Sequence, residues 1–375
     1  MDRFGPQYQI GFDSSKVSAE NIKKFNKVRS ILEKEYYMDV DENTLLEGAV
    51  AGMADSLKDP YTSYFNKEQM KMFMEKSEGS YVGIGISITT DNNGLLTVIE
   101  PFEGSPAAKA GIKQGDKIIK VDDSDVTAIK DENMVISMIK GKENTNVKVT
   151  VYRQTEGKSI DFELVRKKIK ISNISSEIMD GNIGYIKLVM FDSNIAKDFE
   201  EHLNKLLQKK IRGLVIDLRD DPGGDYSQVV QIADRLLPKG LIVYTEDRNK
   251  RRAEEQSDEK ELEMPISVLI NGNSASASEI LAGALKDHKK ATLVGTKSFG
   301  KGLVQTIRPL DDGSGIKVTI ARYFTPSGVC IQGIGIMPDI EVTLDEKYKG
   351  LPASQVPKED DVQLKKALEA VKAAQ

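Results

Sequence analysis

The spacing of apolar residues divides the chain into four predicted segments. Residues 14–77 show the three-to-four spacing of amphipathic helices. Residues 78–168 change to short runs rich in β-branched residues and glycine, which predicts a β-rich module. Residues 169–345 alternate strand-like and helix-like runs, and residues 346–375 are again helical. We therefore expect an α/β multidomain protein with helical segments at both ends.

The third segment favours a largely parallel central sheet. Gly213–Leu218 is a near-continuous apolar run of the kind that is buried on both faces of a sheet. Amphipathic helices are predicted over Asn194–Gln208 and Ala275–Asp287, and such alternation is typical of a sheet covered by helices. Asp247–Glu263, by contrast, carries mixed charges and is predicted to be a solvated loop, with a mobile flap near a site as the alternative.

The composition narrows the possible chemistry. The 375-residue chain has a net charge of −5, one cysteine, Cys330, and two histidines, His202 and His288. These few residues exclude an intrachain disulfide and the usual spaced zinc motif, so we expect no metal and no cofactor. The sequence has no apolar run long enough to span a membrane and no basic patch with interleaved aromatic residues, so nucleic acid is not an expected partner. Both histidines are predicted to be surface or helix-end residues.

A glycine-rich motif opens the β-rich module. In Gly83–Ile86 the glycines allow backbone N–H groups to converge on a carboxylate, although alone the motif could be an ordinary bulge. Gly104–Ile112 and Gly115–Ile118 follow it, and the combination resembles the signature of PDZ domains rather than an unrelated β-rich module. That resemblance implies capture of a C-terminal tail, with an extended peptide added to a strand edge. The implied peptide-binding residues are Val82, Gly83, Ile84, Gly85 and Ile86.

A run of hydroxyl side chains precedes the helix that follows Ile270. Ser276 and Glu279 fit a capping box, which would be a purely structural role. The same position also suits a nucleophile, because the N–H groups at a helix start can stabilise an oxyanion. The motif alone leaves both interpretations open.

Two glycine-containing loops add candidate groups. Lys301 lies between two glycines in apolar surroundings, which would lower its pKa, although it could be an exposed lysine in a turn. To act as a base at neutral pH, a lysine pKa must fall about 3 units from about 10.4, or roughly 4 kcal/mol. Gly223 and Gly224 follow a predicted buried strand, and their N–H groups could form half of an oxyanion hole or belong to a plain Pro-Gly turn.

Together these motifs resemble the carboxy-terminal processing (tail-specific) proteases, peptidase family S41. The marks are Asp217–Gly224, Ser274–Ile280 and Phe299–Gln305, and similar segments at Leu46–Met53 and Gly335–Ile340 extend the resemblance over nearly the whole chain. The resemblance implies an α/β protease core of the crotonase/ClpP-like type joined to a PDZ domain. It also implies a serine endopeptidase that recognises the C-terminal tails of its substrates.

The resemblance assigns roles residue by residue. Ser276 is the implied nucleophile, Lys301 its general base, and Gln305 the residue that orients the lysine. The implied oxyanion donors are the backbone N–H groups of Gly223, Gly224 and Ala277.

Two positions depart from the family pattern. Asp221 stands where the family usually has Asn, which leaves the fine geometry of its loop open. Lys140 stands where many relatives have Arg, so gating of the protease by the PDZ domain through this residue is open as well.

The resemblance also implies partners and a location. We expect protein or peptide substrates with free C-terminal tails, and a homodimer formed through the terminal helices. The expected location is extracytoplasmic, in the bacterial cell envelope, with any signal or membrane anchor in a segment absent from this chain.

Two other classes of protein compete with this interpretation. One is a PDZ-containing scaffold with an inactive core, against which the intact Ser276, Lys301 and Gln305 argue. The other is a crotonase-like acyl-CoA enzyme, against which the PDZ motif and the lack of an evident CoA-binding pattern argue.

Overall fold

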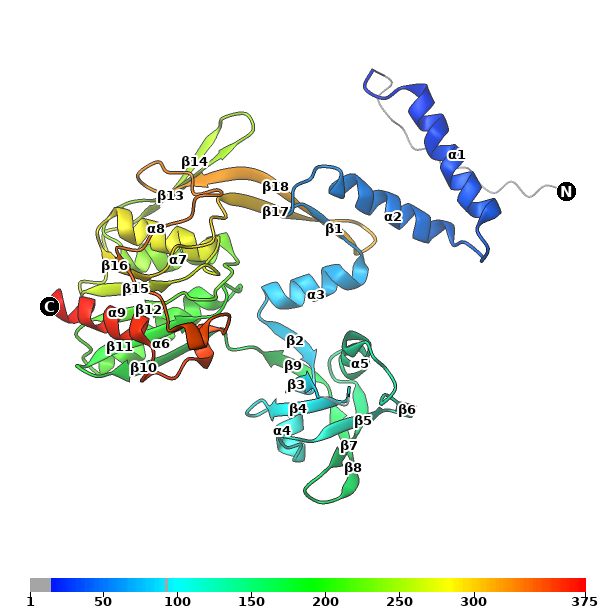
Figure 1. Ribbon diagram of the computed structural model, residues 1–375, viewed down its shortest axis with the longest axis horizontal. Helices are drawn as coiled ribbons and strands as arrows, with labels where there is room; N and C mark the ends of the chain where they lie inside the picture. Colours follow the sequence, from blue (N-terminus) through cyan, green and yellow to red (C-terminus); the bar gives the residue numbers. More distant parts are fainter. Residues whose placement is uncertain (1–14, 92–93) are drawn as a thin grey trace. The chain divides into compact units, whose positions relative to one another are not determined.

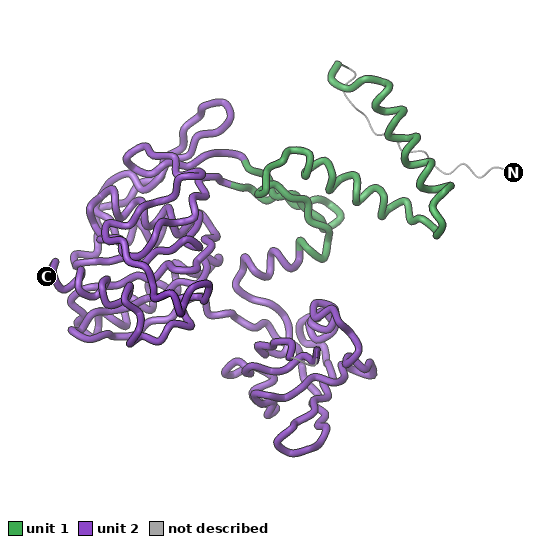
Figure 2. Tube along the Cα trace, viewed as in Figure 1, with its two compact units in different colours: residues 1–70, 305–319 green, residues 71–304, 320–375 purple. Residues whose placement is uncertain are grey.

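The chain divides into two structural units. The computed structural model describes residues 15–91 and 94–375. One unit comprises residues 1–70 and 305–319, and the other comprises residues 71–304 and 320–375 (Figure 2). The predicted division into four segments stays a prediction.

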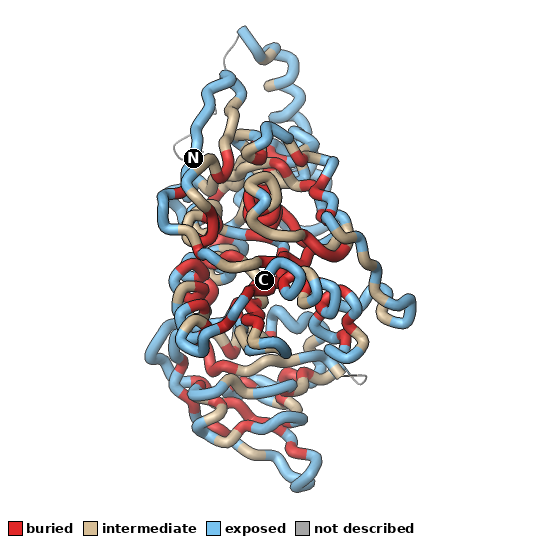
Figure 3. Tube along the Cα trace, turned by 90° about the vertical axis from the view of Figure 1, so that its left-hand side faces the viewer, coloured by how far each residue is buried: buried red, intermediate tan, exposed pale blue. Residues whose placement is uncertain are grey.

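The first unit is built from helices and a small antiparallel sheet. Ser18 and Asp41 cap the first two helices by accepting hydrogen bonds from backbone N–H groups. None of the residues of the first helix is buried, and Figure 3 colours this helix almost entirely as exposed. The elements are α1 (Ala19–Glu35), α2 (Glu42–Asp55), β1 (Ser63–Phe65), the start of α3 (Lys67–Ser77), most of β17 (Leu303–Pro309) and the start of β18 (Gly315–Phe324), with β1 and β17 each paired to β18.

The second unit contains the β-rich module, with the sheet order β3-β4-β5-β7-β8 and β6 paired to β5. Gly85 adopts φ +77° and separates β2 from β3. A buried apolar cluster that includes Ile84, Val98 and Val149 forms its core. The elements are β2 (Ser80–Gly83), which pairs with β9 (Lys167–Lys170), β3 (Ile86–Thr90), β4 (Leu96–Pro101), α4 (Pro106–Ala110), β5 (Lys117–Val121), β6 (Ser124–Asp125), α5 (Glu132–Ile139), β7 (Asn146–Arg153) and β8 (Lys158–Val165).

A six-stranded sheet with the order β10-β11-β12-β15-β16-β19 is the central layer of the part of the second unit that follows the β-rich module (Figure 1). All neighbours except β10 and β11 run parallel, which confirms the predicted largely parallel sheet. All four residues of β12 are buried, as predicted for Gly213–Leu218. The strands are β10 (Ile174–Met179), β11 (Ile183–Leu188), β12 (Leu214–Asp217), β15 (Ile266–Ile270), β16 (Ala291–Gly295) and β19 (Ile340–Glu341).

Helices cover both faces of this sheet. Buried residues of α6, α7 and α8 share one apolar cluster with the strand residues Ile186, Ile216 and Val268. Residues of α9 share a second cluster with Val215 and Leu269, whose side chains point to the other face. No helix in the described part of the chain is long and apolar enough to span a bilayer. The helices are α6 (Ile195–Gln208), α7 (Tyr226–Leu236), α8 (Ala277–Asp287) and α9 (Val362–Ala373), and η1 (Glu346–Tyr348) and η2 (Ala353–Gln355) are short 3₁₀ turns.

The charged run over Asp247–Glu263 corrects one prediction. Part of it forms β14 (Arg252–Ser257), which pairs antiparallel with β13 (Gly240–Asp247), so the prediction of a simple solvated loop is wrong there. Charged residues are common on edge strands because they oppose pairing with other chains. The guanidinium of Arg252 also lies 3.7 Å from the centre of the Tyr244 ring, which gives the charged side chain an aromatic partner.

Candidate active site

Three loops leave the same edge of the parallel sheet. They follow β12, β15 and β16, which are neighbours in the strand order and run parallel. In sheets of this kind, ligands bind at the carboxyl ends of the strands. The loops contain, in order, Gly223 and Gly224, Ser276, and Lys301. The topology therefore brings the predicted catalytic segments to one edge of the sheet.

Ser276 occupies a sharp turn at the start of α8. Its φ of 56° and ψ of −112° are unusual for a residue with a side chain. Such conformations cost on the order of 1–3 kcal/mol and persist where the surrounding structure enforces them. Here the Tyr323 hydroxyl donates to the Ser276 carbonyl at 3.1 Å, and the Ser276 N–H donates to Glu279 Oε2 at 3.0 Å. The turn is thus held from both sides, and the structural role of Glu279 at the helix start is compatible with a nucleophile at Ser276.

The Glu279 carboxylate ties the serine loop to the lysine loop. The residue is completely buried. Its Oε1 accepts hydrogen bonds from Ser298 Oγ at 2.5 Å and from the Gly300 N–H at 2.8 Å. Its Oε2 accepts from the Ser276 N–H at 3.0 Å and from the Lys301 N–H at 2.9 Å. One buried carboxylate oxygen therefore fixes the backbones of both predicted catalytic residues.

Gly223 lies directly against the serine turn. A Cβ placed on it would lie 2.8 Å from both the Ala277 nitrogen and Ser276 Cβ, and its φ is +93°. A Cβ on Gly224 would lie 2.1 Å from the carbonyl oxygen of Phe191. Only glycine fits at either position without moving the neighbouring backbone. The Gly223 backbone therefore packs closely against the start of α8 beside Ser276.

Asp221 lies beneath this loop and is completely buried. Its backbone carbonyl accepts from the Ala275 N–H and the Ser278 hydroxyl, each at 3.0 Å. Its Oδ1 accepts the Gly223 N–H at 2.8 Å, whereas Oδ2 is the one buried side-chain polar atom without a hydrogen-bond partner in residues 15–91 and 94–375. Burial raises the pKa of the Asp221 carboxyl to about 7.

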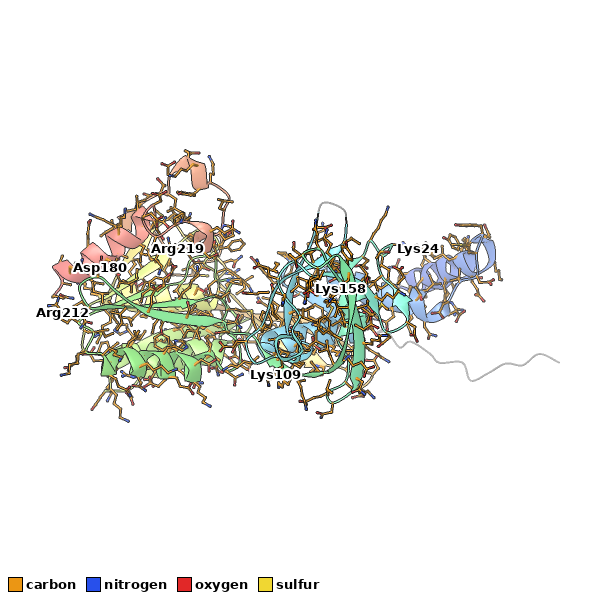
Figure 4. All side chains as sticks on the ribbon, turned by 90° about the horizontal axis from the view of Figure 1, so that it is seen from below. Lys24, Lys109, Lys158, Asp180, Arg212 and Arg219 are labelled. Carbon is orange, nitrogen blue, oxygen red and sulfur yellow. The ribbon has the colours of Figure 1, made fainter. Side chains whose placement is uncertain are left out.

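A buried ionic cluster supports the start of the same loop. Arg219 is 2% exposed, and its guanidinium donates to Asp217 Oδ2 at 2.6 Å and to Asp361 Oδ2 at 2.8 Å. Gln363 Oε1 accepts from the same guanidinium at 3.0 Å, and the Tyr185 hydroxyl donates to Asp217 Oδ2 at 2.7 Å. Figure 4 labels Arg219 near the C-terminal helix. The cluster thus joins the end of β12 to α9.

Comparison with known proteins decides the family. Residues 182–342 match the profile of peptidase family S41, residues 82–164 that of the PDZ domain, and residues 7–69 that of the activating protease CtpB N-terminal domain. A carboxy-terminal-processing protease of Bartonella bacilliformis is 39% identical over 340 residues, which cover 88% of this chain and 77% of the relative. The carboxy-terminal processing protease CtpA of Bacillus subtilis is 35% identical over 345 residues, which cover 92% of this chain and 73% of the relative.

This chain belongs to the carboxy-terminal processing proteases of peptidase family S41. The family predicted from the motifs is confirmed, and with it the class, a serine protease with a PDZ domain. A solved structure assigned to the S41 proteases, from Bacteroides fragilis, shares the fold with a TM-score of 0.53 at 14% identity, over 99% of this chain and 100% of that one.

In this S41 protease Lys301 and Gln305 lie on either side of the start of β17. Lys301 is partly buried, and its backbone is held by Glu279 as described above. The Gln305 side chain donates to Thr319 Oγ1 on β18 at 3.4 Å. The orientation of Lys301 by Gln305 stays a prediction.

The predicted peptide-binding residues of the PDZ domain surround the turn between two strands. Val82 and Gly83 belong to β2, and Ile86 begins β3. The carbonyl of Gly85, in the turn, accepts from Ser105 Oγ at 3.0 Å and from the Phe102 N–H at 2.9 Å. These contacts fix the turn, and Ile84 is buried beneath it.

Lys140 ends α5 of the PDZ domain. Its ammonium lies 2.8 Å from Glu75 Oε2 on α3 and 4.8 Å from the centre of the Tyr81 ring. Lys140 therefore connects the PDZ helix to the helix that leads into the domain.

Both histidines are engaged away from the serine turn. His202 Nδ1 lies 2.6 Å from Ser176 Oγ. His288 caps the end of α8, and its Nε2 lies 2.8 Å from the carbonyl oxygen of Leu241 on β13. The four-donor role of Glu279 and the unpaired oxygen of Asp221 were not among the predictions from the sequence. The role of Glu279 could have been inferred from its position, because it is the one carboxylate in a run of small or apolar residues at the start of a helix. A carboxylate buried in such a run requires hydrogen-bond donors from elsewhere in the fold.

Proposed function

We propose that Ser276 is the nucleophile of this protease and that Lys301 is its general base. The observation that carries this proposal is the shared carboxylate oxygen, Glu279 Oε2, which binds the backbone N–H groups of both residues. A nucleophile and base must keep a fixed separation, and a buried group that holds both loops supplies that constraint.

The reaction follows from these roles. Neutral Lys301 takes the proton from Ser276 Oγ as the oxygen attacks the peptide carbonyl carbon. The C–N bond then breaks, the leaving amine takes a proton from the Lys301 ammonium, and an acyl ester remains on Ser276. Water hydrolyses this ester by the same proton path. Gln305 holds the Lys301 side chain in position.

The oxyanion of each tetrahedral intermediate binds to backbone N–H groups. The proposed donors are Ala277 at the start of α8 and either Gly223 or Gly224. The closeness of Gly223 to Ala277, whose nitrogen would lie 2.8 Å from a Cβ placed on the glycine, supports this assignment. Donors of this kind lower the barrier because they are already aimed at the charge that develops.

We further propose that the PDZ domain binds the C-terminal tail of the substrate. In the sheet order of the described residues, β3 is a terminal strand, so an extended peptide can pair with it. Ile86 and Ile88 on this strand and Met138 on α5 are partly buried apolar residues that an apolar tail can cover. The tail carboxylate would bind at the Gly83–Ile86 turn.

Lys140 is proposed to couple tail binding to the rest of the chain. It lies at the end of α5, and its ion pair with Glu75 extends to α3. Both side chains of the pair are largely buried, with exposed fractions of 27% and 18%, so a shift of α5 on tail binding would disturb a contact with energetic weight.

The oligomeric state and location complete the proposal. α1 exposes Phe25, Val28, Ile31 and Leu32 by 41–52% each, and an apolar stripe of this kind favours association. We propose that it forms the homodimer contact. The extracytoplasmic location is proposed from the family.

Cleavage assays on two variants test the catalytic assignment. Ser276→Ala and Lys301→Ala are each expected to abolish cleavage of a protein substrate with an apolar C-terminal tail, while circular dichroism shows an intact fold. Lys297→Ala removes an exposed lysine from the same loop and is the matched control, with expected wild-type activity. Full activity of either catalytic variant would refute the proposal.

A further inference from the structure

The buried carboxyl of Asp221 is a group that the mechanism above does not use. It lies in the loop that carries the proposed oxyanion donors. Its Oδ1 accepts the Gly223 N–H at 2.8 Å, and its Oδ2 is buried without a hydrogen-bond partner. A buried polar atom without a partner is rare in folded proteins and calls for a physical explanation.

No positively charged side chain in the described residues forms an ion pair with the Asp221 carboxyl. Asp217 on β12 disfavours ionisation of the carboxyl, and Lys187 on β11 favours it less than the nearby Gly223 N–H and Ser278 hydroxyl do. Burial, aided by the charge of Asp217, outweighs the nearby Gly223 N–H, the Ser278 hydroxyl and Lys187, which all favour the ionised form, and raises the Asp221 pKa to about 7. The other charged side chains of the surrounding loops are engaged elsewhere: Arg219 with Asp217 and Asp361, Asp220 with Asn271, Asn273 and the Ala353 N–H, and Glu279 with its four donors.

We propose that Asp221 is a positioning residue that supports the oxyanion hole only while its carboxyl is protonated, so that its ionisation limits proteolysis at alkaline pH. This inference rests on the proposed roles of Ser276 and Gly223.

Two physical effects act in the same direction. A neutral carboxyl is a weak acceptor, so the Gly223 N–H can also turn to a substrate oxygen. An ionised carboxylate binds the same N–H in a charge-assisted hydrogen bond of roughly twice the strength, and it holds the donor away from the substrate. It also places a negative charge beside the site where the oxyanion develops, and burial keeps that repulsion from being screened by solvent.

Ionisation of Asp221 and ionisation of the general base change the rate of proteolysis in opposite directions as the pH rises. Lys301 must lose its proton to act, so its titration makes the rate rise with pH. Asp221 ionisation makes the rate fall with pH. A protease with both groups has a bell-shaped profile, whose alkaline side belongs to Asp221.

The test is the pH dependence of kcat/KM for a short peptide substrate in wild type, Asp221→Asn and Asp221→Ala. The wild-type value is expected to fall about tenfold per pH unit above about pH 7. Both variants are expected to lack this fall, so that their activity relative to wild type rises roughly fiftyfold from pH 7 to pH 9. Asp220→Asn is the matched control, because its neighbouring carboxyl has a lowered pKa and its variant keeps the alkaline fall.

Several outcomes would overturn the inference. They are a wild-type profile without the alkaline fall, or an unchanged fall in a folded, active Asp221 variant. If neither variant folds, the rate at which a fluorophosphonate labels wild-type Ser276 must still fall above about pH 7, and a rate that does not fall refutes the inference. Failure of the catalytic assignment itself would show separately, as activity in Ser276→Ala.

Discussion

The buried carboxyl of Asp221 also predicts how stability depends on pH. Between pH 3.8 and about 7 the native state keeps the proton on Asp221, whereas the unfolded chain has released it. Raising the pH through this window therefore favours unfolding. Each pH unit of the window costs the native state about 1.4 kcal/mol. From pH 5 to pH 8 the expected loss from Asp221 alone is roughly 3 kcal/mol.

Asp221→Asn removes this loss without a large change in side-chain volume. We expect the free energy of unfolding of the variant, minus that of wild type, to rise by roughly 3 kcal/mol between pH 5 and pH 8. The difference in the free energy of unfolding at pH 5 depends on how well the amide fits locally. The prediction therefore concerns only how this difference changes with pH. Urea denaturation followed by circular dichroism at several pH values measures it, and all other titrating groups cancel in the difference.

Asp220→Asn supplies the control for the neighbouring position. Burial tends to raise the pKa of Asp220, but hydrogen bonds from Asn273 and Asn271 outweigh it and hold the pKa below its usual value. The stability that Asp220 contributes is therefore lost only as the pH falls toward that lowered pKa, and its variant should show no slope between pH 5 and pH 8. A flat difference for Asp221→Asn over this range would refute the reasoning, because it would mean that the carboxyl is already ionised in the native state.

Three further predictions concern the buried carboxylate of Glu279, the ion pair of Lys140 and the exposed helix α1. Glu279→Gln replaces one acceptor oxygen with an amide donor, which leaves two buried N–H or O–H groups without an acceptor, at a cost of about 1–3 kcal/mol each. Urea denaturation should therefore show a free energy of unfolding that is lower by roughly 2–6 kcal/mol, and cleavage should be abolished. Lys140→Gln should remove the stimulation of short-peptide cleavage by an added apolar tail peptide, and unchanged stimulation would contradict the coupling. Ile31→Glu tests the proposed homodimer contact and should shift the mass in light scattering from dimer to monomer at micromolar concentration. An unchanged mass would contradict the proposed contact.

The sheet could be predicted from the sequence because its strands are buried on both faces. Gly213–Leu218 had no polar face to place toward solvent, and the structure buries all of β12. The start of α8 was less predictable. The helix begins at Ala277 rather than Ala275, because Ser276 takes a positive φ that interrupts the helical backbone.

Features that depend on distant parts of the chain were not predictable from local patterns. The strand Arg252–Ser257 has little apolar signal and forms because β13 supplies hydrogen-bonding partners. The donors of Glu279 come from residues 276 to 301. Two partners of Arg219, Asp361 and Gln363, lie at the start of α9, more than 140 residues further along the chain. The departure at Asp221 was visible in the motif, but its buried, unpaired oxygen follows only from the packing of three loops.

Covalent labelling tests the central claim, the Ser276–Lys301 pair, most directly. A fluorophosphonate should label wild-type protein once per chain, and mass spectrometry of the digested protein should place the adduct on Ser276. Labelling should be lost in Ser276→Ala and fall strongly in Lys301→Ala, while Lys297→Ala labels as wild type. An adduct on another residue, or undiminished labelling in Lys301→Ala, would contradict the account.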